Sequence, residues 1–143
     1  MTHSDSESKL LSHVLVPVAD EEDARLSARE LAPYSPERVT ALHVVEKGEG
    51  VPDKTPVEQS EQLAEDAFTA IRETFPDADE ETAYRRDVVQ AILDVADELD
   101  ASAIAFRPRR SGRLVRLLSG DRTTKLVTQA DRPVIALPRG EDG

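Results

Sequence analysis

The chain has 143 residues, no cysteine and a formal net charge of −11 at pH 7. This length is typical of one domain, and without cysteine neither a disulfide framework nor a thiolate metal site can form. The acidic surface disfavours nucleic acid and anionic membranes as partners, and no apolar run approaches the roughly 20 residues of a membrane span.

The charged composition is also typical of proteins that work in concentrated salt. Lysine is rare, with only Lys9, Lys47, Lys54 and Lys125, whereas Asp and Glu together number 29. Salt screens the repulsion between so many carboxylates. We therefore expect a halophilic source. The alternative is an acidic protein from ordinary salt.

The ends of the chain are polar. Residues 1–9 predict a disordered tail without the apolar segment of a signal peptide, so we expect a cytoplasmic location. A single domain is predicted over residues 10–139, followed by a polar tail at 140–143.

The first apolar run, residues 13–18, is typical of a strand buried on both faces of a parallel sheet. Asp20 and Asp23 come next and favour a helix start. Pro33 and Pro36 end this helix. Its apolar face consists of Ala24, Ala28, Leu31 and Ala32.

The middle of the chain repeats this alternation. Residues 39–45 predict a second strand, 48–56 form a loop rich in Gly and Pro, and 57–75 predict a long amphipathic helix. Residues 82–86 are polar, so a strand there is expected near an edge of the sheet.

The last part adds two further units of the same kind. Residues 88–99 predict a helix and 103–106 a fourth strand. A basic segment at 107–120 precedes a helix at 123–130, in which Leu126 and Val127 are expected to face inward. Residues 134–137 predict the last strand.

The alternation of five strands with four helices predicts an α/β fold. Such a chain forms a five-stranded parallel sheet between two helical layers, a three-layer α/β/α sandwich of Rossmann-like type. Ligands of these folds bind beyond the carboxyl ends of the strands. Here those ends fall near residues 18–20, 44–46 and 106–110.

Positive charge is concentrated near the C-terminus. Residues 107–139 hold nine basic and two acidic residues, a net charge of +7, whereas the rest of the chain carries −18. The arginines either form an anion site or pair with acidic neighbours, and the sequence leaves both open. Nucleic acid is disfavoured because Phe106 is the only aromatic residue nearby on which a base could stack.

Other kinds of site find little support. His3, His13 and His43 lack the ligand spacing of a metal site, and no phosphate-binding motif with G-x-x-x-x-G-K-[ST] or G-x-G-x-x-G spacing is present. The acidic run from Asp20 to Asp23 is interpreted as a solvated helix start. We therefore predict no catalytic set and no metal.

Several of these segments resemble the universal stress protein family, whose fold is of the adenine nucleotide alpha hydrolase-like type. The resemblance covers roughly residues 10–138. It rests on the segments Val14–Val18, Leu42–Glu46, Ile92–Phe106, Leu117–Gly120 and Ala130–Ile135.

The resemblance also implies where a nucleotide would bind, and the loop is altered there. ATP-binding members carry Gly, two residues, Gly, nine residues, Gly, then Ser or Thr, because glycines let backbone N–H groups approach phosphates. With Gly120 as the third glycine, Arg107 and Arg110 replace the first two and Asp121 replaces the hydroxyl residue. The aspartate that usually ends the first strand is replaced by Ala19.

The substitutions in this loop have opposite effects on the binding of an anion. Asp121 repels phosphate, whereas the two guanidinium groups can hold an anion by forked hydrogen bonds. The nucleotide or anion site implied by the resemblance comprises Pro17, Ala19, Asp20, Val44, Arg107, Arg110, Gly120, Asp121, Arg122 and Thr123.

The resemblance implies a non-catalytic stress-response or regulatory binding module that does not bind ATP in the usual way. The alternatives are a member that binds ATP or another phosphorylated ligand through an arginine-modified loop, with weak ATP hydrolysis, and a regulatory partner of a transporter. A homodimer is implied through the edge strand Val134, Ile135, Ala136 and Leu137. We expect no membrane insertion.

Overall fold

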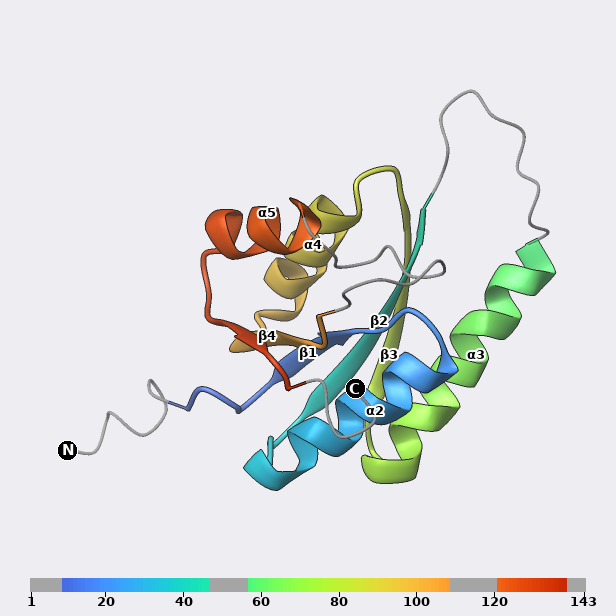
Figure 1. The fold of residues 1–143 in the computed structure, drawn as a ribbon, viewed down its shortest axis with the longest axis horizontal. Coiled ribbons are helices and arrows are strands. Elements are labelled where there is room, and N and C mark those ends of the chain that lie inside the picture. Colours follow the sequence, from blue (N-terminus) through green and yellow to red (C-terminus); the bar gives the residue numbers. More distant parts are fainter. Residues whose placement is uncertain (1–8, 47–56, 109–120, 139–143) are drawn as a thin grey trace.

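The computed structural model describes residues 9–46, 57–108 and 121–138, so the predicted tails, apart from Lys9, and the predicted loop at 48–56 lie outside the described residues. Strands and helices alternate as the sequence predicts (Figure 1). The elements are β1 (Val14–Pro17), α2 (Glu21–Leu31), the short 3-10 helix η1 (Ala32–Tyr34), β2 (Val39–Glu46), α3 (Val57–Thr74), β3 (Asp79–Arg85), α4 (Val88–Leu99), β4 (Ala103–Phe106), α5 (Asp121–Gln129) and β5 (Val134–Ala136).

The five strands form one parallel sheet in the order β3-β2-β1-β4-β5. The chain runs outward from β1 through β2 to β3, then returns to the other side of β1 for β4 and β5. The strand order therefore reverses between β1 and β4, which is where such folds bind ligands. The predicted parallel sheet is confirmed, and so are the edge positions of β3 and β5.

Helices cover both faces of the sheet, as predicted for a three-layer fold (Figure 1). The central strand β1 is buried on both sides. Val14, Val16 and Val18 belong to a core cluster with α2 and α3, whereas Leu15 belongs to a second cluster with α4 and Leu126 of α5. This explains why residues 13–18 form a near-continuous apolar run instead of alternating with polar residues.

Three details of the prediction are wrong. Strand β3 begins at Asp79, three residues early, because it pairs with β2 from Thr40 to Glu46 and its edge position leaves the carboxylates in water. Helix α5 begins at Asp121, two residues before the predicted start. Val127 is 53% exposed while its neighbour Leu126 is buried, because adjacent residues on a helix point to different sides.

The amino ends of the strands are tied together by polar side chains. The Ser102 hydroxyl accepts a hydrogen bond from the His13 backbone N–H (2.9 Å) and lies 2.7 Å from the Leu10 carbonyl oxygen, to which it donates. The buried His13 ring contacts the Thr40 hydroxyl at 2.8 Å through Nε2. This end of the sheet is thus closed by internal hydrogen bonds.

Candidate functional site

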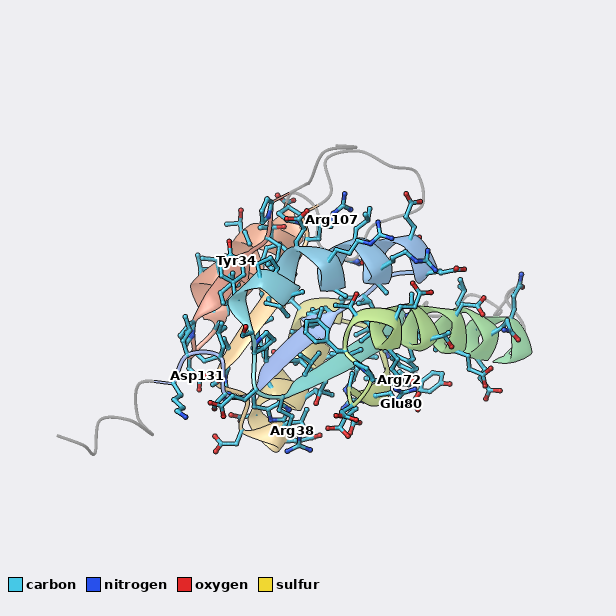
Figure 2. The ribbon with its side chains drawn as sticks, turned by 90° about the horizontal axis from the view of Figure 1, so that it is seen from below. Tyr34, Arg38, Arg72, Glu80, Arg107 and Asp131 are labelled. Carbon is cyan, nitrogen blue, oxygen red and sulfur yellow. The ribbon has the colours of Figure 1, made fainter. Side chains whose placement is uncertain are left out.

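The carboxyl ends of β1, β2 and β4 lie at the same end of the sheet because the three strands are parallel neighbours. Three predicted site residues occupy these ends. Pro17 closes β1, Val44 lies near the end of β2, and Arg107 follows β4 directly. Pro17 and Val44 are buried, whereas Arg107 is half-buried. Figure 2 places Arg107 and Arg38, which precedes β2, at opposite sides of the molecule.

Two aspartates fix the turn that leads from β1 into α2. Asp20 caps the helix, because its Oδ1 accepts the backbone N–H of Asp23 at 2.8 Å. Asp23 in turn reaches back, and its Oδ2 accepts the backbone N–H of Ala19 at 2.8 Å. The expectation of a solvated acidic run is wrong for Asp23, which is only 4% exposed.

A buried histidine contacts the same turn from β2. The Nδ1 atom of His43 lies 3.3 Å from the carbonyl oxygen of Val18. A carbonyl oxygen only accepts, so Nδ1 carries the hydrogen and Nε2 has the lone pair. Burial lowers the pKa of His43, and this outweighs the opposing effects of the Val18 hydrogen bond and of Asp20.

The start of α5 contributes three more predicted residues. Asp121 is exposed and is the first residue of the helix, and the half-buried Arg122 and Thr123 follow it. The amino end of this crossover helix lies at the carboxyl end of the sheet, like that of α2. Lys125 joins the helix to Asp87, the N-cap residue of α4, through an ion pair at 3.1 Å. Arg110 and Gly120 lie outside the described residues.

The basic residues of 107–139 are expected either to form an anion site or to pair with acidic neighbours. Arg132 donates to the carbonyl oxygens of Ala96 and Ala101 at 2.9 and 2.7 Å, and it pairs with Asp97 at 2.8 Å. Lys125 pairs with Asp87, so both of these cations serve the fold. Among the described arginines of the basic segment, Arg107 is the one that directly follows a strand, β4.

The predicted edge strand is short and partly open. Val134 and Ile135 are half-buried and Ala136 is exposed, whereas Leu137 lies past the end of β5 and is buried in the core. Ile104 N–H donates to the Pro133 carbonyl and Leu137 N–H to the Phe106 carbonyl. Residues alternate in direction along a parallel strand, so the backbone N–H groups of Val134 and Ala136 point away from β4.

Comparison with known proteins identifies the family. A model of the universal stress protein family matches residues 11–138. The chain therefore belongs to the universal stress protein family. No curated protein sequence matches it significantly.

Solved structures of the family share the fold at low sequence identity. The universal stress protein UspA from Lactobacillus plantarum is 24% identical with a TM-score of 0.63, over 90% of this chain and 98% of that one. A protein from Archaeoglobus fulgidus in complex with dAMP is 22% identical, with a TM-score of 0.63 over 90% and 99% of the two chains. An Arabidopsis thaliana member with AMP bound is 14% identical, with a TM-score of 0.60 over 92% and 94%.

Two residues of this universal stress protein's candidate site were not among those predicted. The sequence gives His43 no ligand-binding role beyond the metal site that its spacing disfavours, and it places Asp23 in an exposed acidic run. Asp23 could have been found, because helical spacing places it one residue before the buried Ala24 and four before the buried Ser27. No sequence signal pairs His43 with Val18, because that contact joins β2 to the turn that follows β1.

Among the residues described, no helix combines the length and the apolar character needed to span a membrane.

Proposed function

We propose that this universal stress protein is a non-catalytic regulatory module that binds a nucleoside monophosphate, such as AMP, and does not bind ATP in the usual way. The observation that carries the proposal is the exposed Asp121 carboxylate at the first residue of α5. A helix start at the carboxyl end of the sheet is where phosphates are normally held. A carboxylate there repels them, and the repulsion grows with the number of phosphates.

Two further observations support a smaller anion. Arg107 at the end of β4 offers a guanidinium group that can hold one phosphate by paired hydrogen bonds. The family members from Archaeoglobus fulgidus and Arabidopsis thaliana were solved with dAMP and AMP. The candidate ligand-contacting residues remain those predicted from the sequence, together with His43.

Thermal unfolding with AMP or with ATP-Mg tests the proposal. A ligand at 100 times its dissociation constant stabilises a protein by about 2.7 kcal/mol. We expect AMP to raise the melting temperature and ATP-Mg to raise it less. The variant Asp121→Ser should respond more strongly to ATP-Mg, whereas Asp131→Ser, which also removes an exposed carboxylate, should not. A larger shift with ATP-Mg than with AMP in the unmodified protein would contradict the proposal and favour an ATP-binding member.

We also propose that the protein forms a homodimer through β5. The outward-pointing N–H groups of Val134 and Ala136, beside partly exposed apolar side chains, support pairing with a second copy. Ala136→Pro removes one such donor without removing a bond to β4. We expect twice the chain mass in solution for the unmodified protein and a monomer for Ala136→Pro. A monomeric unmodified protein at micromolar concentration rejects the dimer.

The composition supports a further proposal, that the protein works in the cytoplasm of a halophilic cell. Repulsion among 29 acidic residues weakens as salt is added. We expect the melting temperature to rise as KCl increases from dilute to molar. A fall over that range would reject adaptation to high salt.

A further inference from the structure

The peptide group that joins Val18 to Ala19 has both of its polar atoms occupied by buried side chains. The Val18 carbonyl oxygen accepts from His43 Nδ1 at 3.3 Å, and the Ala19 N–H donates to Asp23 Oδ2 at 2.8 Å. His43 is 7% exposed and Asp23 is 4% exposed. We call this arrangement the Val18–Ala19 clamp.

The clamp lies where the strand order reverses. Val18 and Ala19 directly follow β1, and β1 is the strand from which β2 and β4 diverge to either side. A free backbone N–H at such a position is a ready donor for a ligand anion. Here Asp23 takes that donor, and Asp20 takes the N–H of Asp23 itself.

The clamp also places negative charge beside the turn. Asp23 lies in the first turn of α2, where the helix dipole favours a negative group, and its Oδ2 accepts the Ala19 N–H. We infer that Asp23 is a specificity-determining residue, which makes the end of β1 accept uncharged hydrogen-bonding groups of a ligand and reject anionic ones. This inference rests on the proposed function, because it assigns the ligand's charge pattern at that same site.

The isosteric variant Asp23→Asn removes the charge and keeps an oxygen that can accept from Ala19. The matched control is Glu22→Gln, which removes one charge from an exposed side chain on the same turn. Calorimetric titrations would compare adenosine with AMP for each protein. We expect Asp23→Asn to strengthen AMP binding relative to adenosine by about tenfold. The reason is that the variant removes the repulsion between one carboxylate and the phosphate in a partly buried site. Glu22→Gln should change the ratio less than about twofold, because exposed charges are screened.

Equal changes in the two variants would overturn the role of Asp23 while leaving the proposed function intact. Failure of adenosine and AMP to bind the unmodified protein would contradict the proposed function, and the charge filter with it.

A second measurement tests the clamp without any ligand. Amide exchange followed by NMR should show a slowly exchanging Ala19 N–H in the unmodified protein and in Asp23→Asn, and a rapidly exchanging one in Asp23→Ala. Rapid exchange of the Ala19 N–H in the unmodified protein would overturn the clamp.

Discussion

The two ends of the sheet each hold a buried histidine, yet the two histidines have different surroundings. At the amino end, the His13 ring contacts the Thr40 hydroxyl. The His13 backbone N–H donates to the Ser102 hydroxyl, which donates to the Leu10 carbonyl oxygen. At the carboxyl end, His43 contacts a backbone carbonyl in the turn that follows β1. Both residues are buried histidines, so neither residue type nor burial distinguishes them. Their positions do: His13 lies at the end of the sheet closed by internal hydrogen bonds, and His43 lies at the end where a ligand is expected.

The largest expected effect comes from Arg132, at the amino end. The Arg132 side chain is 12% exposed. Its guanidinium donates to two carbonyl oxygens, that of Ala96 in α4 and that of Ala101 before β4. Arg132→Ala leaves these acceptors without that donor, so we expect urea unfolding to show a loss of about 3 kcal/mol. AMP affinity should not change. If Arg132→Ala kept the unfolding free energy of the unmodified protein and lost AMP binding, the assignment of a structural role to the amino end would be contradicted.

Ser102 gives a smaller effect at the same end. Ser102→Ala removes the acceptor of the His13 N–H and a donor to Leu10. We expect a loss of about 1.5 kcal/mol in the free energy of unfolding. Ser102→Thr keeps the hydroxyl and serves as the control, which should lose less. Equal losses in both variants would mean that the hydroxyl contributes nothing.

The pH dependence of stability should include both histidines. Burial lowers the pKa of His13, assisted by the charge of Arg38, and burial lowers the pKa of His43. The unfolded chain therefore binds protons more readily than the folded one, and stability should fall as pH decreases below about 6.5, the unperturbed value.

Two variants divide this pH effect between the ends. His13→Gln retains a polar group near Nε2, and His43→Asn retains one near Nδ1. We expect each to flatten the fall in unfolding free energy between pH 7 and pH 5, and only His43→Asn to alter how AMP affinity depends on pH. A steeper fall in either variant, or an altered AMP profile in His13→Gln, would contradict the assignment.

Much of the fold could be predicted from the sequence. The apolar run at 13–18 and the amphipathic helices report burial directly, because side chains of a central parallel strand are covered on both faces. The sequence predicts too late a start for β3, because Asp79, Glu80 and Glu81 have low strand propensity and pairing with β2 outweighs it. The inward position expected for Val127 is wrong because adjacent apolar residues on a helix point to different sides.

The candidate site was harder to predict. The strand ends that carry Pro17, Val44 and Arg107 followed from the alternation and from the family resemblance. The contacts of His43 and Asp23 did not, because they join side chains to a backbone peptide in a neighbouring strand or turn. Such contacts depend on register and on the path of a turn, which a pattern of residue types does not specify.

The most direct test of the account is an NMR titration of the unmodified protein with AMP. We predict that amide shifts will appear at Val18, Ala19, Val44 and Arg107, with no shift at His13, Ser102 or Arg132. Shifts confined to the amino end of the sheet, or none at saturating AMP, would contradict the account.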